Sequence, residues 1–509
     1  MTTPSALPPV GPGAPTPPID IAGGAEAAGA RLESAVPVPD PVIDRLHKTG
    51  ARVSTDHAVR AEASRDWWPG AMRWATEGRV AGLAGVVVTP ADADQVSDVL
   101  RLCNAAKVPV TAAGGRSGVC GASVPAFGGV ILDTTALTGI TGIDDESMTL
   151  DVAPGTFGDH LEHELREHGL TLGHWPQSMA LSTVGGWLAC RGAGQLSNRY
   201  GKIEDMVTGL DVVLADGSTI ATGGAPRAAV GPDLTQLFVG SEGTLGVVTG
   251  ARFRLHPAPE HERWAAYSFA SFAAANDACR RIVQRGASPA VLRVYDAVEA
   301  DRSYQTGDRA VLLVMDQGDA VMVDASMTVV GQICDDPATG AASLDDALVG
   351  RWLEHRNEVS ALEALVSKGY VLDTMEISAR WSRLGAIYSA TTEALLGVDG
   401  AMAASAHQSH AYQDGACLYF TFAGTPGDDT DHESMYRAFW DAGQQAVLDA
   451  GGSLSHHHGV GLNRSRFMAD ALGGGLDVLQ SVKDALDPNG ILNPGKLGLR
   501  SPFGEVAYP

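Results

Sequence analysis

Three glycine-rich segments constrain this 509-residue chain more than any other feature. They span residues 113–121, 182–187 and 240–246, and the first follows a strand pattern at 108–112. Glycine allows positive φ angles and close approach of the backbone to a ligand, and such loops bind phosphate groups through backbone N–H donors. We therefore expect a site for an anionic cofactor that needs few basic side chains.

The charge and hydropathy of the chain exclude several classes of partner. There are 36 Lys and Arg against 60 Asp and Glu, a formal net charge of −24 that disfavours nucleic acid and anionic lipid. No apolar run approaches the roughly 20 residues of a membrane span, and no secretory signal pattern begins the chain. The six cysteines form no CxxC pair. We expect a cytoplasmic protein with a small-molecule substrate and no integral membrane segment; a homodimer is possible for such a chain.

Composition and periodicity divide the chain into segments. Ten of the 27 prolines fall in the first 41 residues, so we expect a disordered tail over residues 1–45. From there to about residue 258, short apolar runs alternate with helical patterns, including a helix at 91–107 and a hairpin at Asp216-Gly217. A second mixture of strands and amphipathic helices follows, which indicates an α+β fold with two domains.

Five motifs occur in an order that resembles the vanillyl-alcohol-oxidase superfamily of flavoproteins. The resemblance implies a two-part FAD-binding domain at 46–258, an α+β cap (substrate) domain at 259–470, and a segment at 471–509 that returns to the FAD domain. The motifs are GGRSGVCG, PQSMALSTVGGW, RYGKIEDMV, PDLTQLFVGSEGTLGVVT and LDPNGILNPGKL.

The resemblance assigns FAD to the glycine-rich segments. No GxGxxG lies between a strand and a helix, so a Rossmann nicotinamide site is disfavoured. Val119 stands where relatives with a covalent flavin carry histidine, so the FAD is expected to be non-covalent. The residues expected to contact it are Gly114, Gly115, Arg116, Ser117, Gly118, Val119, Pro176, Ser182, Thr183, Gly185, Gly186, Glu242, Gly243, Gly246 and Val247.

Within the superfamily, the chain is most similar to the alkyldihydroxyacetonephosphate synthase family, which makes ether lipids through a covalent adduct of the flavin. STVGGW, YQDGACLYF and GGSLSHHHGVG carry this similarity. It implies an active site made of Tyr419, Arg293 and the triple histidine His456, His457 and His458. On a strand, three adjacent histidines could not all face one way, so one of them is expected to point away.

Two departures from that family bear on the reaction. Arginines of the family fall at Leu362 and His407 here, and guanidinium groups suit a phosphate monoester because they bind it bidentately. Their loss favours an oxidoreductase that oxidises a hydroxyl-bearing molecule by hydride transfer to the flavin, with ether synthesis as the alternative. In both reactions we expect His457, hydrogen-bonded to Tyr419, to remove a proton while Arg293 positions the substrate.

A further alternative is a metal-assisted, FAD-dependent 2-hydroxy-acid dehydrogenase. His407, His410 and the triple histidine could gather a divalent ion. Such dehydrogenases end in EHG where this chain has HHG, which removes the carboxylate ligand. The prediction is therefore no metal, with FAD as the cofactor.

Overall fold

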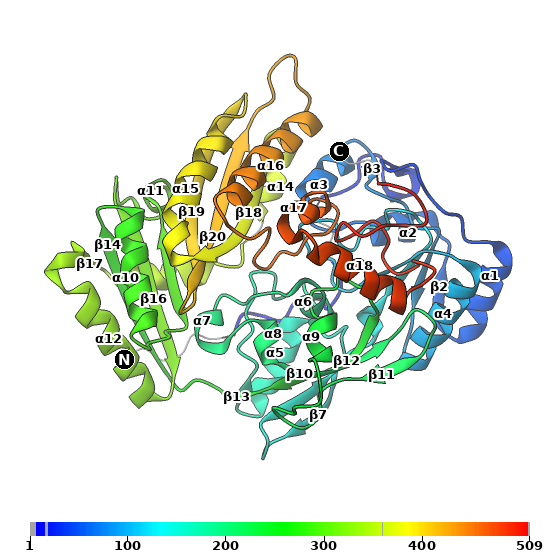
Figure 1. The fold of residues 1–509 in the computed structure, drawn as a ribbon, viewed down its shortest axis with the longest axis horizontal. Coiled ribbons are helices and arrows are strands. Elements are labelled where there is room, and N and C mark those ends of the chain that lie inside the picture. The colour runs from blue at the N-terminus through cyan, green and yellow to red at the C-terminus, as the bar shows by residue number, and fades with distance from the viewer. Residues whose placement is uncertain (1–6, 16–18, 359, 507–509) are drawn as a thin grey trace.

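The computed structural model describes residues 7–15, 19–358 and 360–506, and Figure 1 shows their arrangement. The first α+β layer is a four-stranded sheet in the order β2-β4-β6-β5. Its last three strands are parallel, and α4 (Ala93–Ala106) buries Val96, Val99, Leu100 and Cys103 against them. The strands are β2 (Arg52–Ser54), β4 (Val86–Thr89), β5 (Val110–Ala113) and β6 (Val130–Asp133).

A second, antiparallel sheet of five strands completes the FAD-binding half, in the order β11-β10-β12-β8-β7. The expected hairpin at Asp216-Gly217 is present: β10 pairs with β11, and Gly217 has φ 81°. The elements here are β7 (Ile140–Asp144), β8 (Thr149–Val152), α5 (Gly158–Glu167), β9 (Leu170–Thr171), α6 (Val184–Cys190), α7 (Ser197–Tyr200), α8 (Ile203–Met206), β10 (Val207–Val213), β11 (Thr219–Ala221), α9 (Leu234–Phe238), β12 (Val247–Arg254) and β13 (His256–Pro257).

The cap is a seven-stranded antiparallel sheet in the order β17-β14-β16-β15-β19-β20-β18. Strand alternation gives it two buried faces. On β15, Leu292 and Val294 pack with the cap helices, whereas Val291 and Tyr295 join the core of the FAD-binding half. The strands are β14 (His261–Phe269), β15 (Val291–Tyr295), β16 (Ala310–Gly318), β17 (Ala342–Leu344), β18 (Val371–Arg380), β19 (Ala401–Ala411) and β20 (Gly415–Gly424).

Helices cover the outer face of the cap sheet (Figure 1). The hydrophobic faces of α10 and α12 lie over β14–β16, and those of α15 and α16 lie over β18 and β20. These four helices are α10 (Phe272–Gln284), α12 (Ala320–Cys334), α15 (Trp381–Leu396) and α16 (His432–Asp449). The other cap helices are α11 (Ala297–Tyr304) and α13 (Ala347–His355), which pack in the core shared with the FAD-binding half, and α14 (Ser360–Ser367), which packs with α3 (Pro69–Ala75).

The N-terminal segment differs from the disordered tail expected over residues 1–45. Residues 1–6 and 16–18 of that tail lie outside the described residues. Ile19 and Ile21 are buried against α3 (Pro69–Ala75), and β1 (Gly29–Ala30) pairs in parallel with β3 (Arg79–Val80). The many prolines predicted disorder. Burial of a few apolar side chains nevertheless stabilises the segment against the entropy lost when it becomes ordered, and a count of prolines does not show where those side chains pack. Two further helices follow, α1 (Asp40–Leu46) and α2 (His57–Ala63).

The end of the chain lies on the FAD-binding half. After α17 (Met468–Leu472) comes α18 (Gly475–Leu486), whose Lys483 Nζ donates to Thr244 O at 2.7 Å. Leu492 forms a parallel bridge with Val110 of β5. Figure 1 shows α18 running beside the first α+β layers, away from the outer cap helices. Among the described residues, no helix is long and apolar enough to cross a membrane.

Candidate active site

The first two glycine-rich segments pack against each other. The first follows β5, and the second leads into α6. A Cβ at Gly114 would clash with Thr183 Oγ1, and one at Gly115 would overlap the carbonyl of Leu181. Both glycines are therefore required by the close approach of two backbones, which holds the loops together as one surface.

Next to these packed glycines, the loops leave open space. A Cβ at Gly118 would meet no atom within 4 Å, and one at Gly243 would meet only the methyl group of Ala112. Two buried donors beside the first loop, Trp67 Nε1 and Asn463 Nδ2, have no hydrogen-bond partner among the described residues. Because unpaired buried donors are costly, an acceptor from a ligand is expected there. These features fit a bound FAD.

Trp67 and Asn463 are candidate site residues that the sequence analysis missed. The backbone N–H of Trp67 donates to Gly118 O at 2.9 Å, and that of Asn463 donates to Cys120 O at 3.1 Å. These bonds join residues far apart in the chain. No local signal in the sequence marks either residue.

Several residues expected to contact the cofactor are instead used within the protein. Ser182 Oγ accepts from Trp187 Nε1 at 2.7 Å and donates to Ser178 O at 2.9 Å. A Cβ at Gly185 would press on Pro154, and one at Gly246 would press on Val212. Val247 is buried in the core between the two sheets. The sequence analysis did not separate the residues of these segments that face a ligand from those that pack within the protein, and Gly185 and Gly246 are packed.

Glu242 differs most from its expected role. Its carboxylate is buried and accepts from the backbone N–H groups of Val460, at 2.6 Å, and Gly461, at 2.9 Å. Its own N–H donates to Ala189 O, and its carbonyl accepts from Asn493 Nδ2 at 2.6 Å. Glu242 therefore ties the third glycine-rich segment to the segment that follows the triple histidine.

A second buried carboxylate holds the triple histidine itself. Glu376 Oε1 accepts from the backbone N–H groups of His456, His457 and His458 at 3.1, 2.9 and 2.7 Å. Its Oε2 pairs with the buried Arg464. Burial alone would raise the pKa of Glu376, but Arg464 and the histidines hold it well below the usual value. The histidines therefore lie in a turn around one carboxylate and not on the strand that the sequence suggested.

The rings of His456 and His457 face each other beside that of His410. His456 Nδ1 lies 2.8 Å from His457 Nδ1, and its Nε2 lies 2.7 Å from the hydroxyl of Tyr412. His410 Nδ1 lies 2.6 Å from Ser197 Oγ. Burial lowers the pKa values of His410, His456 and His457 well below the usual value, so these rings are neutral at pH 7.

Tyr419 lies beside the histidines without the expected hydrogen bond to His457. Its hydroxyl donates to Thr374 Oγ1 at 3.0 Å, on the neighbouring strand β18. Its ring stacks on His407 with 4.8 Å between centroids, and the centroid of His457 is 6.2 Å away. The register of β18 against β20 places Tyr419 directly opposite Glu376 and next to Thr374, and this register could not be predicted from the sequence.

Arg293 completes the cluster from β15. Its Nε donates to the hydroxyl of Tyr295 at 2.7 Å, and its Nη2 lies 2.6 Å from His407 Nε2. His407 Nδ1 lies 2.8 Å from Glu299 Oε2, so Glu299 fixes the ring that faces Arg293. The side chain of Leu362, the other departure from the family pattern, is not among those that the structure describes.

Comparisons with known proteins agree with this fold. Residues 84–223 match the family model of the FAD binding domain, and residues 258–497 match that of the C-terminal domain of FAD linked oxidases. A solved alkyldihydroxyacetonephosphate synthase superposes with a TM-score of 0.75 at 24% identity, covering 92% of this chain and 89% of that one. The chain belongs to the FAD-linked oxidases of the vanillyl-alcohol-oxidase superfamily, and it is an enzyme whose cofactor is FAD.

Relatives within the family carry different names. An uncharacterized FAD-linked oxidoreductase YgcU of Escherichia coli O157:H7 is 31% identical over 82% of this chain and 89% of the relative. The alkyldihydroxyacetonephosphate synthase of Trypanosoma brucei brucei is 30% identical over 83% and 74%. The glycolate oxidase subunit GlcD of Bacillus subtilis strain 168 is 30% identical over 81% and 88%.

Proposed function

We propose that the protein oxidises a hydroxyl-bearing small molecule with a single anionic group, by hydride transfer to FAD. The observation that carries the proposal is the environment of Arg293. This half-buried guanidinium is hydrogen-bonded to a phenol and a neutral imidazole, and its side chain packs on the rings of Tyr295 and Trp352. A partly desolvated cation whose direct partners are neutral is suited to an anionic substrate group.

The residues around Arg293 have separate roles in this proposal. His457 is neutral, and since its Nδ1 faces His456, its Nε2 is left to accept the hydroxyl proton of the substrate. Arg293 orients the substrate anion, and Glu299 keeps His407 in the tautomer that accepts from Arg293. Bound FAD supplies the redox chemistry by accepting the hydride.

Ether synthesis is the second candidate, since two of the named relatives and neighbours are alkyldihydroxyacetonephosphate synthases. A phosphate monoester carries close to two negative charges and is best held by several guanidinium groups. Here His407, with a pKa lowered by burial and by Arg293, stands where that family has an arginine. This difference supports the oxidoreductase reaction.

A metal-assisted reaction is the third candidate, favoured by one observation. One nitrogen from each of His410, His456 and His457 lies within 4.8 Å of the others, close enough to share a metal ion. Ser197, Tyr412 and the pairing of two of the rings already supply protein partners for them. The proposal remains a reaction without metal.

Anaerobic mixing of the holoenzyme with candidate substrates tests the proposal. We expect a 2-hydroxy acid, with glycolate and D-lactate as the first probes, to bleach the flavin, and oxygen or an acceptor dye to restore the colour. An acyl-dihydroxyacetone phosphate that releases fatty acid without consuming acceptor would instead establish ether synthesis. Prior dialysis against a chelator should leave the bleaching unchanged; loss that zinc or manganese restores would establish the metal-assisted reaction.

A further inference from the structure

Three side chains form a continuous line from the substrate side of the histidine cluster to the edge of the cap. His457 Nδ1 lies 2.8 Å from His456 Nδ1, and His456 Nε2 lies 2.7 Å from the hydroxyl of Tyr412. Tyr412 follows directly after β19, is partly exposed, and precedes two exposed residues, Gln413 and Asp414. The line therefore joins the half-buried ring of His457, through the buried ring of His456, to the surface.

The protonation states along this line suit proton transfer. Burial lowers the pKa values of His456 and His457, so each neutral ring carries one N–H donor and one lone pair. Burial raises the pKa of Tyr412, so its hydroxyl keeps its proton at neutral pH. Each group can therefore receive a proton on one side and donate one on the other.

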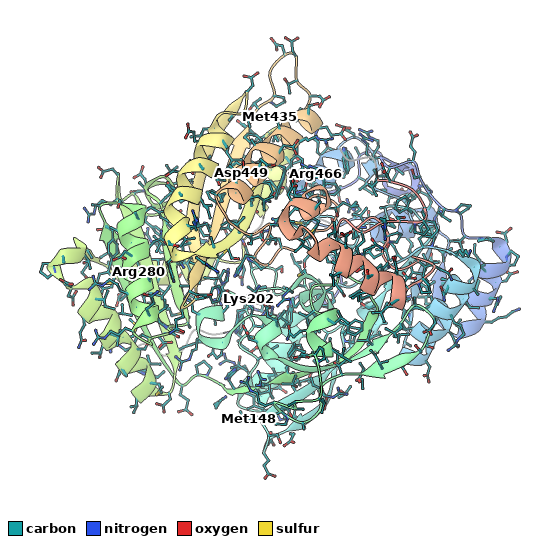
Figure 2. All side chains as sticks on the ribbon, viewed as in Figure 1. Met148, Lys202, Arg280, Met435, Asp449 and Arg466 are labelled. Atoms are coloured by element: carbon teal, nitrogen blue, oxygen red, sulfur yellow. The ribbon has the colours of Figure 1, made fainter. Side chains whose placement is uncertain are left out.

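The outer end of the line meets charged groups. The acidic residues Glu204 and Asp205 lie near enough to act electrostatically on Tyr412. Lys202 Nζ donates to His456 O at 2.7 Å and lies 3.1 Å from a carboxylate oxygen of Glu204. Figure 2 shows Lys202 where the cap strands meet the FAD-binding half. Carboxylates at such an edge can pass protons on to water.

We propose that His456 and Tyr412 relay to the surface the proton that His457 removes from the substrate, an inference that rests on the proposed function. The hydroxyl proton binds Nε2 of His457, whose Nδ1 proton moves to Nδ1 of His456. The Nε2 proton of His456 then moves to Tyr412, which releases its own hydroxyl proton to water or to an acidic neighbour. Each group gains and loses one proton, and the hydride leaves separately with both electrons, so no further reactant is needed.

Without such a path, the proton would stay on the enclosed ring of His457. His456 is buried, and His457 is enclosed by His410, Tyr419 and His458, with ring centroids 4.5–6.2 Å away. A charged imidazole there would carry the same burial cost that lowers its pKa. Removal of the proton is therefore part of each turnover.

The timing of proton release during flavin reduction tests the relay. Holoenzyme is mixed anaerobically with the 2-hydroxy acid that bleaches it, at matched pH, in weak buffer that contains phenol red. Because the hydride carries both electrons away, oxidation of the alcohol leaves one proton, that of the substrate hydroxyl, to be released. In the wild-type protein we expect the indicator to change in step with the flavin absorbance.

The Tyr412→Phe variant breaks the line at its outer end and keeps the ring. We expect its proton release to lag behind flavin reduction by roughly tenfold or more, as for loss of a positioned proton-transfer group. Tyr267→Phe is the matched control, because Tyr267 is buried on the far side of the cap sheet with α10 and α12. Release in step with flavin reduction in Tyr412→Phe would overturn the relay.

A second variant guards against a folding defect. His456→Gln keeps a hydrogen-bonding side chain but has no ring through which a proton can pass, so it should show the same lag. If both variants lose FAD, the two residues support the cofactor site and the relay is wrong. The two failures can be told apart: flavin that no hydroxy acid bleaches contradicts the proposed function, whereas bleaching with proton release in step in both variants contradicts only the relay.

Discussion

Two buried carboxylates determine where the reactive histidines lie. Glu376 of the cap accepts three successive backbone N–H groups from His456 to His458, and Glu242 of the FAD-binding half accepts two more from Val460 and Gly461. Charge-assisted bonds of this kind are stronger than neutral ones. The histidine turn is thus fixed from both halves of the molecule at once.

At the residue scale, the first prediction concerns proton removal. We expect His457→Ala to bind FAD normally but to lower the rate of flavin reduction by roughly 10²–10⁴, the range for loss of a positioned base. Tyr419→Phe should fall at the low end of that range, because its hydroxyl is bonded to Thr374. Stopped-flow absorbance with the bleaching substrate measures both. Wild-type rates in both variants would contradict these roles and make His407 and His410 the next candidates for the base.

The second prediction concerns the anion site. Arg293→Ala should raise KM for an anionic substrate more than it lowers kcat, because the guanidinium binds a part of the substrate that does not react. Arg293→Lys keeps the positive charge but lacks the planar guanidinium group that binds an anion through two N–H donors. It should therefore recover part of the affinity that Arg293→Ala loses. An uncharged alcohol analogue serves as the control. Equal losses with that analogue would contradict an anion-binding role.

At the element scale, the glycine-rich loops combine two functions that one substitution can separate. Gly114 and Gly115 hold two loops together, so larger residues there would disturb the protein itself. Gly118 faces open space, with no atom within 4 Å of a Cβ. We expect Gly118→Val to fold normally and to lose FAD, because the side chain would occupy space that the cofactor needs.

Gly427→Val is the matched control for this prediction. Gly427 also has open space around its Cβ, but it lies in the exposed turn between β20 and α16. The 450 nm absorbance of the purified variants, together with their far-UV circular dichroism, separates cofactor loss from misfolding. A folded Gly118→Val protein with full FAD would remove this loop from the binding site.

At the scale of the whole molecule, His174 makes stability depend on pH. Its ring is fully buried, lies 4.5 Å from that of Trp187, and has no hydrogen-bond partner for either nitrogen among the described residues. Burial lowers its pKa from 6.5 to about 3. Between those values the unfolded chain binds a proton that the folded protein rejects, so stability is lost as pH falls through that range.

The matching variant is His174→Phe, which keeps an aromatic ring and removes the titration. Between pH 7 and pH 5 the wild-type protein should lose about 2 kcal/mol more of its free energy of unfolding than the variant does. Urea unfolding followed by tryptophan fluorescence at both pH values measures the difference. Parallel pH profiles would show that His174 does not titrate in this way.

A further prediction at this scale is that the flavin is not covalently bound to the protein. Val119 stands where a histidyl linkage would form, and its side chain offers no nucleophile. We expect acid precipitation to leave the FAD in the supernatant with an unmodified protein pellet. Colour retained in the pellet, or a protein mass raised by a flavin, would contradict a non-covalent cofactor.

The order of motifs along the chain was enough to indicate the superfamily and FAD as the cofactor. Periodicity and glycine content are local properties, and they predicted α4, the Asp216-Gly217 hairpin and the loop after β5. The packing of the N-terminal segment was missed, because it depends on where Ile19 and Ile21 meet α3.

The tertiary structure alone decided which groups meet. The register of β18 against β20 sets Tyr419 opposite Glu376, and chain crossings bring Glu242 to Gly461 and Asn463 to the first glycine loop. The members of each pair are separated by tens to hundreds of residues in the chain. Neither residue alone indicates which partner it contacts. Local sequence patterns were therefore enough to predict the family and its cofactor. The hydrogen bonds that orient each histidine depend on contacts between residues far apart in the chain, which a local pattern does not predict.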